Sequence, residues 1–433
     1  MTLRFGTDGV RGVALSELTT DYAGRLGVAV VVVMGPGPWL VGRDTRESGP
    51  ELVAALAAGI TAAGGSVIDA GILPTPALAH LSQVRALPAA MVTASHNPWH
   101  DNGVKVFAAG GSKLPDATER AIEHAVHDAG AVVGTATTEK LDATDVYVQH
   151  LVQGNARLDG VSVVLDCANG AMSHVAPAAF TALGAAVRVI HAAPDGRNIN
   201  EQCGATHTAS LAAAVRAEGA DLGLAFDGDG DRVIAVDHLG NVVDGDRLIA
   251  LAALHLKEQQ RLRHNAVVVT VMSNLGFHRA MQAAGIEVIT TAVGDRYVLE
   301  ELERGGFSLG GEQSGHIIYR DLATTGDGLL AALRLAAFVH GHHSPLATLA
   351  GDVMETYPQV LVNVRVADRH PNAAAELADE IAAAEQSLGD EGRILVRASG
   401  TEPLIRVMVE APTAAAAQAI ADDLAGHVRR RFG

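Results

Sequence analysis

Aromatic residues, cysteines and long apolar runs are all scarce in this sequence. Of its 433 residues, 3% are aromatic and 48% are hydrophobic, so aliphatic side chains must fill its cores. Two cysteines, Cys167 and Cys203, are too few for a disulfide framework or for a zinc cluster built from thiolates. The apolar run 28–34 is too short to span a bilayer, and the first residues show no signal-peptide pattern. We therefore expect a cytoplasmic protein with no membrane partner.

Positive charge is also in short supply. Lys and Arg number 32 against 49 Asp and Glu, which gives a formal net charge of −17. A protein that binds nucleic acid usually presents a basic face to the phosphate backbone. The one basic run, 429–431, ends a helical pattern, where positive charge suits the helix dipole. We therefore expect no nucleic-acid partner.

One strand–helix–strand pattern occurs three times along the chain. Residues 39–76, 161–196 and 266–296 each contain a β-branched run, a polar turn, an Ala-rich stretch, a Gly stop and a second β-branched run. Apolar strands that alternate with helices are typical of parallel sheets covered on both faces. The sequence therefore predicts three similar α/β domains with mixed, mainly parallel sheets.

The last part of the chain has a different pattern. It reads as strand, helix, two strands around a loop, and a final helix, which predicts a smaller α+β domain. A chain of this length is too long for one core. We predict four domains, with these ranges: 1–150, 151–253, 254–357 and 358–433.

The most specific motif is "FDGDGDR" at 226–232. Three aspartates alternate with glycine, and carboxylates this close repel one another unless a cation lies among them. Hard oxygen ligands suit Mg²⁺, and a calcium loop would need a Glu where His238 stands. An Asp-Gly surface turn is the plain alternative. We interpret the motif as a metal site formed by Asp227, Asp229 and Asp231.

A second motif, "LVRASGTEPLIRV" at 395–407, joins two predicted strands. Hydroxyls, backbone amides and two guanidinium groups around a small-residue turn are what a phosphate dianion binds. A hairpin turn with incidental arginines is the alternative, but in an acidic protein we favour phosphate binding. The residues concerned are Arg397, Ser399, Gly400, Thr401 and Arg406.

Two further loops are ambiguous when taken alone. "GGEQSGH" at 310–316 offers Glu312 and Ser314 to sugar hydroxyls, although most loops of this composition are only loops. In "VTASHNP" at 92–98 the adjacent Ser95 and His96 do not form a triad, and no G-x-S-x-G elbow is present. The residues alone leave Ser95 between a helix cap, a loop residue and a catalytic group.

In combination, "TASHNP", "DGDGDR", "GEQSGH" and "RASGTEP" resemble the α-D-phosphohexomutases over essentially the whole chain. The opening "RFGTDGVRG" and Gln313 are similar to the branch that acts on glucosamine phosphates. Relatives that act on mannose or glucose phosphates commonly carry Met at that position, and they remain the alternative. Two departures, Val106 in place of a frequent aromatic and a short segment at 34–38, touch no proposed ligand.

The resemblance implies four domains around a central cleft and a reaction that interconverts glucosamine 6-phosphate and glucosamine 1-phosphate through a sugar 1,6-bisphosphate. Ser95 would carry the phosphoryl group as phosphoserine, with one Mg²⁺ held between it and the three aspartates. The small-molecule partner would be a hexosamine phosphate, and the sequence leaves open whether the chain forms a homodimer.

The resemblance also implies roles for single residues. Glu312 and Ser314 would bind sugar hydroxyls, and the 397–406 loop would bind the phosphate of the substrate. Arg11 and Arg232 would support the phosphoserine region. The candidates for proton transfer are Lys105 and His316. Because a general base at neutral pH needs a suitable pKa, we expect cationic neighbours and burial to lower the pKa of Lys105.

Two rival functions use part of the same residues. A metal-dependent phosphatase would use Asp227 as its nucleophile and would not need Ser95. A non-catalytic sugar-phosphate sensor would keep the 397–406 loop and could dispense with the aspartates. Retention of all three aspartates argues against the sensor.

Overall fold

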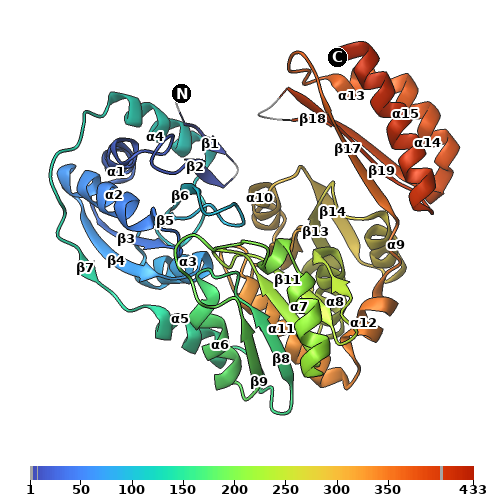
Figure 1. The fold of residues 1–433 in the computed structure, drawn as a ribbon, viewed down its shortest axis with the longest axis horizontal. Coiled ribbons are helices and arrows are strands. Elements are labelled where there is room, and N and C mark those ends of the chain that lie inside the picture. Colours follow the sequence, from blue (N-terminus) through green and yellow to red (C-terminus); the bar gives the residue numbers. More distant parts are fainter. Residues whose placement is uncertain (1–2, 7, 400–402) are drawn as a thin grey trace. The chain divides into compact units, whose positions relative to one another are not determined.

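The computed structural model describes residues 3–6, 8–399 and 403–433 (Figure 1). The chain forms two compact units. The first contains the residues up to Met272 together with Ile286–Asp352, and the second contains Ser273–Gly285 and Val353–Gly433. Among the described helices, none is long and apolar enough to cross a membrane.

A seven-stranded sheet forms the N-terminal part of the first unit, in the order β1-β2-β6-β5-β3-β4-β7. Strands β3, β4, β5 and β7 are parallel to their neighbours within that group, whereas β1, β2 and β6 add antiparallel pairs. Buried aliphatic residues such as Val41, Leu56 and Val104 form its core. The strands are β1 (Phe5–Gly6), β2 (Gly9–Val13), β3 (Pro38–Arg43), β4 (Ser66–Ile72), β5 (Ala89–Val92), β6 (Asp101–Phe107) and β7 (Glu139–Lys140), and the helices are α1 (Thr20–Met34), α2 (Gly49–Ala62), α3 (Thr75–Arg85), α4 (Asp116–Asp128) and α5 (Thr144–Gln153).

The second sheet has five strands in the order β12-β11-β10-β8-β9. The β8, β9 and β10 strands pair in parallel, and β11 returns antiparallel to β10. The chain reverses between β10 and β11 within residues 227–232, which are the residues of the aspartate motif. The strands are β8 (Ser162–Asp166), β9 (Ala186–Ile190), β10 (Leu222–Phe226), β11 (Val233–Asp237) and β12 (Val242–Val243), and the helices are α6 (Met172–Ala182), α7 (Ala209–Glu218) and α8 (Gly245–Glu258), with a 3₁₀ turn, η1 (Gly204–Thr206).

A four-stranded sheet, β14-β13-β15-β16, completes the first unit. The β13 strand pairs in parallel with β14 and β15, and β16 is antiparallel to β15. Helix α9 follows β13 in the chain but belongs to the second compact unit. The strands are β13 (Ala266–Thr270), β14 (Glu287–Thr291), β15 (Leu309–Gly311) and β16 (Ile317–Tyr319), and the helices are α9 (Leu275–Ala283), α10 (Asp295–Gly305), α11 (Gly328–His342) and α12 (Leu346–Val353), with η2 (Arg263–Asn265).

The second unit contains an antiparallel sheet of three strands, β17-β19-β18. Helix α15 packs on this sheet through buried residues that include Leu424 and Val428 (Figure 1). The strands are β17 (Gln359–Arg365), β18 (Arg393–Ala398) and β19 (Leu404–Glu410), and the helices are α13 (Ala373–Glu376), α14 (Ala378–Leu388) and α15 (Ala414–Phe432), with η3 (Gly389–Glu391).

The predicted fold class is confirmed. Each of the three repeated stretches is a strand, a helix and a strand, and the two strands pair in parallel in every case. The last part of the chain has the predicted α+β order. The four domain ranges stay predictions, because the two compact units divide the chain along other lines.

Candidate active site

The aspartate loop lies at the carboxyl end of β10. Asp227 and Asp229 are fully buried and Asp231 is 3% exposed. One carboxylate oxygen of each lies within 4.8 Å of the others. Gly228 permits this packing, because a Cβ at that position would lie 2.6 Å from the carbonyl oxygen of Ser95. The aspartate loop therefore places three carboxylates next to the turn that contains Ser95.

The oxygens of these carboxylates fit a divalent cation. Within the described part of the chain, Asp229 Oδ1 and Asp231 Oδ1 are buried and make no hydrogen bond. Burial, followed by repulsion from Asp231 and Asp229, raises the pKa of Asp227 well above its ordinary value. Buried oxygens without donors, supplied by three adjacent carboxylates, form the ligand set that Mg²⁺ takes in proteins.

Ser95 lies in the turn that follows β5 and is fully buried. Its hydroxyl donates to Asp227 Oδ2 at 2.6 Å, and its backbone N–H donates to Thr93 Oγ1 at 3.0 Å. The Ser95 φ of 52° lies in the left-handed region, which a residue other than glycine adopts only when its surroundings hold it there. His96 Nδ1 lies 3.4 Å from the hydroxyl, so the serine is shared between a carboxylate and an imidazole.

Arg46 holds this turn in place. It is fully buried, pairs with Asp44 at 2.9 Å, and donates to the carbonyl oxygens of Ser95 and Asn97, each at 2.9 Å. Asn200 donates to the same two carbonyls at 2.9 and 3.0 Å. A guanidinium and an amide therefore fix the backbone on which the Ser95 hydroxyl is carried.

Arg11 also contacts this turn. Arg11 Nη1 donates to the carbonyl of Ala94 at 3.3 Å and to Asn97 Oδ1 at 3.4 Å, and its Nη2 donates to Asp8 at 2.6 Å. The structure thus brings this residue, as the sequence predicts, into the neighbourhood of Ser95.

Lys105 differs from the prediction. Its ammonium group, on β6, lies 2.8 Å from Asp8, 2.8 Å from Asp229 and 2.9 Å from Asp231. Burial lowers the pKa of Lys105, but the three carboxylates together raise it by more. The pKa therefore stands well above the ordinary lysine value. The expectation of a lowered pKa is wrong for this arrangement, because the effect of three carboxylates within 2.9 Å of Lys105 exceeds that of burial and of Arg11.

His316 lies just before β16 and is 2% exposed. Its Nδ1 is 3.7 Å from Asp231 Oδ1, and its Nε2 is 3.6 Å from Asp295 Oδ2. Burial lowers the pKa of His316, but the carboxylate of Asp231, with a further contribution from Asp295, raises it above the usual value. An imidazole held between two carboxylates is suited to carry a proton and to donate it.

A cleft opens beside these groups and encloses about 960 Å³, its open mouth included. Glu312 lines it and accepts a hydrogen bond from the Gly294 N–H at 3.1 Å. Ser314 is exposed at the tip of the same turn. Most of the residues that line it have polar or charged side chains: Arg4, Asp8, Arg11, His96, Asp231, Arg232, Asp295, Glu312 and His316. Such a lining suits a small charged and hydroxylated molecule.

The predicted phosphate loop lies in the second compact unit. Arg397 and Arg406 are directly opposite one another on β18 and β19. Burial, together with repulsion from Arg406, lowers the pKa of Arg397. Ser399 is 7% exposed, whereas Gly400 and Thr401 lie outside the described residues. Two neighbouring guanidinium groups of like charge favour an anion between or beside them.

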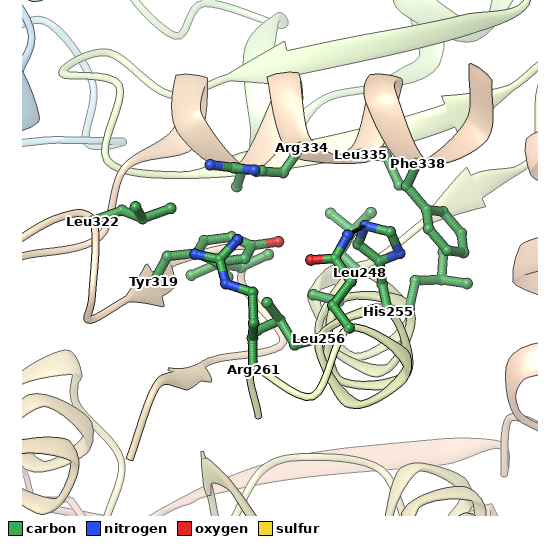
Figure 2. A pocket seen from close by; sticks show the side chains of 14 residues that line it. Leu248, His255, Leu256, Arg261, Tyr319, Leu322, Arg334, Leu335 and Phe338 are labelled. Carbon is green, nitrogen blue, oxygen red and sulfur yellow. Dashed lines mark hydrogen bonds between the residues drawn. The ribbon is translucent and has the colours of Figure 1, made fainter. Parts of the chain in front are cut away.

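A separate apolar pocket lies between helices α8 and α11 (Figure 2). Leu248, Leu335 and Phe338 contribute apolar walls, and the lining also includes Arg261, Tyr319 and Arg334. The lining of this pocket shares no residue with that of the polar cleft. It therefore belongs to the packing of the third sheet and not to the aspartate site.

Several residues of the site were not singled out from the sequence. Asp8 joins Arg11, Lys105 and Lys113, and those three cations hold its pKa well below the usual range although burial would raise it. Thr75 donates to Asp229 Oδ2 at 2.5 Å. The "GTDGVRG" opening contained a signal for Asp8, since a carboxylate three residues before an arginine commonly pairs with it. Nothing in the local sequence marked Thr75.

Four family models match the chain in order: the alpha/beta/alpha domains I, II and III of phosphoglucomutase/phosphomannomutase over residues 2–132, 145–240 and 244–357, and its C-terminal domain over residues 361–427. Full-length relatives are about half identical to the chain. Phosphoglucosamine mutase of Rhodococcus opacus is 52% identical over 440 residues, and that of Saccharopolyspora erythraea is 53% identical over 439 residues. Each match covers 98% of this chain and 98% of the relative. The chain belongs to the phosphoglucomutase/phosphomannomutase family.

Solved structures of other proteins are similar in fold to this phosphohexomutase. A phosphoglucomutase/phosphomannomutase family protein of Burkholderia thailandensis superposes with a TM-score of 0.84 at 28% identity, covering 98% of this chain and 97% of that one. N-acetylphosphoglucosamine mutase of Aspergillus fumigatus, in complex with GlcNAc-6P and magnesium, has a TM-score of 0.71 at 18% identity, covering 100% and 96%. The latter similarity establishes the fold alone. The family models and the full-length relatives identify the chain as an isomerase of the phosphohexomutase type.

Proposed function

We propose that this phosphohexomutase interconverts glucosamine 6-phosphate and glucosamine 1-phosphate in the cytoplasm. The relatives that share about half of its residues over nearly the whole chain are named phosphoglucosamine mutases. The observation that carries the proposal is the hydrogen bond of 2.6 Å between the Ser95 hydroxyl and Asp227, at the edge of three buried carboxylates. That arrangement suits a serine that accepts and returns a phosphoryl group.

In this proposal Ser95 carries a phosphoryl group and passes it to the free hydroxyl of the bound sugar phosphate. The bond from Ser95 Oγ to phosphorus breaks as the bond from the sugar oxygen forms, which gives a sugar 1,6-bisphosphate. After the sugar reverses its orientation, the other phosphoryl group returns to Ser95 Oγ. One substrate phosphate and one enzyme phosphate are therefore conserved in each cycle.

Asp227, Asp229 and Asp231 would hold one Mg²⁺ together with a phosphate oxygen on Ser95. A bound Mg²⁺ neutralises charge on the transferring group, since phosphoryl transfer depends on positioning and electrostatics. Asp227 accepts the hydroxyl hydrogen of the unmodified serine, and the buried Lys105 ammonium adds positive charge beside the same carboxylates. Arg11 and Arg46 keep the turn in its reactive geometry by binding its carbonyls.

Proton transfer has two candidates with different properties in this geometry. Lys105 is held in its charged form by three carboxylates, so it serves first as an electrostatic group. His316, with its pKa raised by Asp231, is better placed to give a proton to the oxygen that leaves and to recover it from the oxygen that attacks. Glu312 and Ser314 would bind sugar hydroxyls, and the 397–406 loop would bind the second phosphate.

The test is a coupled assay that compares glucosamine, glucose and mannose 6-phosphates in the presence of Mg²⁺ and a sugar 1,6-bisphosphate. We expect glucosamine 6-phosphate to be preferred and the active protein to contain a fraction about 80 Da heavier, with the added phosphate on Ser95. Ser95→Ala should abolish both the added mass and turnover. A preference for glucose or mannose phosphate would refute the glucosamine assignment and leave the mutase class intact.

Ser82→Ala is a matched control. Ser82 is also buried in the first sheet region, but its hydroxyl donates only to backbone carbonyls of Leu87 and Ala108 among the described residues. It should keep turnover and show no change in phosphorylation. Release of free phosphate at the full rate by Ser95→Ala would instead establish the phosphatase alternative, with Asp227 as nucleophile.

A further inference from the structure

Three residues with metal-binding side chains meet in the second sheet, away from the aspartate loop. Asp166 ends β8, His191 follows β9, and Cys203 precedes the 3₁₀ turn η1. One ligand atom of each lies within 4.8 Å of the others. Asp166 and Cys203 are fully buried, whereas 31% of the His191 side chain is exposed. The cluster is thus buried on the side of Asp166 and Cys203 and open to solvent on the side of His191.

The orientation of the imidazole is informative. His191 Nδ1 lies 3.1 Å from Asp166 Oδ2, yet among the described residues this buried nitrogen makes no hydrogen bond of acceptable angle. Two ligands bound to one tetrahedral zinc at about 2.0–2.2 Å from the metal are themselves roughly 3.3 Å apart, and both face the metal instead of each other. The Asp166–His191 separation of 3.1 Å is compatible with two ligands of one metal and also with a direct ion pair, and a metal titration distinguishes the two.

The surrounding groups match the outer hydrogen bonds of a metal site. Asp166 Oδ1 accepts the N–H of Ala168 at 3.0 Å, and its Oδ2 accepts the N–H of Gly204 at 3.0 Å. The side-chain amide of Asn169 donates to Cys203 Sγ at 4.0 Å. Carboxylates and thiolates that bind a metal are commonly oriented by such donors.

We propose that Asp166, His191 and Cys203 bind one zinc ion, with a water molecule as the fourth ligand on the exposed side of His191. A carboxylate and a thiolate together balance the two positive charges of zinc. A mixed oxygen, nitrogen and sulfur set selects zinc over Mg²⁺, which prefers oxygen ligands alone. This site is distinct from the Mg²⁺ site of the proposed function and does not depend on it.

The site would brace the phosphoserine turn. Cys203 lies three residues after Asn200, whose amide holds the carbonyls of Ser95 and Asn97. Binding replaces the thiol proton of Cys203 with the metal, and that proton passes to solvent. Because binding releases this proton, uptake of the metal should be favoured as pH rises. A zinc ion bound here would join the two ends of segment 191–203 and so restrain it.

Cobalt provides the test, because a bound Co²⁺ reports a thiolate ligand through a near-ultraviolet sulfur-to-cobalt charge-transfer band. The full-length chain is stripped with a chelator, returned to excess Mg²⁺ so that the aspartates are occupied, and titrated with Co²⁺ and then with Zn²⁺. We expect one equivalent of Co²⁺ to give the band and Zn²⁺ to remove it. Absence of the band in the folded wild-type protein would overturn the proposal.

Variants separate the site from adventitious binding. Cys203→Ser should lose the band, and the matched control Cys167→Ser, which changes the other buried cysteine, should keep it. His191→Asn changes a partly exposed side chain, so the chain should still fold, and should weaken Co²⁺ binding by more than about tenfold. An unchanged affinity in His191→Asn, or a band that survives in Cys203→Ser, would refute the assignment.

Discussion

Replacing Arg46 by glutamine should loosen the turn that carries Ser95. Arg46 is fully buried and pairs with Asp44 at 2.9 Å. Its guanidinium also donates to the carbonyls of Ser95 and Asn97 at 2.9 Å and of Asp101 at 3.0 Å. A glutamine is shorter and uncharged, so it can satisfy at most part of this set.

The size of the expected free-energy loss follows from the buried charge that the substitution leaves without a partner. Loss of the guanidinium leaves the Asp44 carboxylate buried without its cation, a change that typically costs about 3–5 kcal/mol. Thr93 still donates to Asp44 at 2.7 Å, and Asn200 still donates to the carbonyl of Ser95, so the lower end of that range applies. A loss of about 3 kcal/mol corresponds to roughly a 100-fold increase in local opening.

Amide hydrogen exchange measures this opening directly. Peptides that cover residues 89–107 should exchange about 100-fold faster in Arg46→Gln, and mutase turnover should fall with them. The matched control is Arg43→Gln, since the half-buried Arg43 in the same segment donates to the Asp44 carbonyl at 3.2 Å and should matter far less. Asp44→Asn combined with Arg46→Gln should recover part of the loss, because no buried charge then lacks a partner. Equal exchange rates in Arg46→Gln and Arg43→Gln would refute the reasoning. So would a double variant in which the effects of Asp44→Asn and Arg46→Gln on exchange simply add.

Two other changes test other parts of the fold. Gly228→Ala would place a Cβ 2.6 Å from the carbonyl oxygen of Ser95, so we expect a loss of about 1–3 kcal/mol in unfolding free energy and lower turnover. In the control Gly341→Ala, in helix α11, the new Cβ meets nothing within 4 Å, so stability should be unchanged or slightly higher. Equal melting temperatures of the two variants would contradict this. Burial, with a contribution from His150, lowers the pKa of His80 from 6.5 to about 4. The unfolded chain therefore binds a proton that the folded chain does not bind between these values, so stability is complete above pH 6.5 and is lost as pH falls toward 4. His80→Gln should flatten that part of the profile of melting temperature against pH, and an unchanged slope would show that His80 does not contribute.

Local sequence patterns predicted the elements but not all of their partners. The strand–helix–strand repeats and the terminal α+β order are short-range patterns, and the structure contains each of them. The Asp-Gly alternation predicted a tight acidic loop, because glycine permits tight turns and carboxylates this close repel one another unless a cation lies among them. These features depend on residues that are close together in the sequence, so the spacing of those residues is enough to predict them.

The features of the site that the sequence did not predict depend on contacts between residues far apart in the chain. Lys105 was expected among cations because the sequence does not show that Asp8, Asp229 and Asp231 surround it from more than one loop. Thr75 and Asn200 are common residue types at unremarkable positions, and only folding brings them to Asp229 and Ser95. The roles of the site residues stay predictions, and Ser95→Ala tests the role of Ser95.

The hydrogen bond between Ser95 and Asp227 joins residues 132 positions apart in the chain. During synthesis at about 5–20 residues per second, Ser95 therefore waits on the order of ten seconds before Asp227 is even polymerised. Throughout that interval the serine turn lacks its carboxylate acceptor, and it also lacks the amide of Asn200 until residue 200 has been added. A nascent chain can thus complete its first sheet before the contacts that hold the Ser95 hydroxyl exist, so those contacts form only once the loop after β10 has been made.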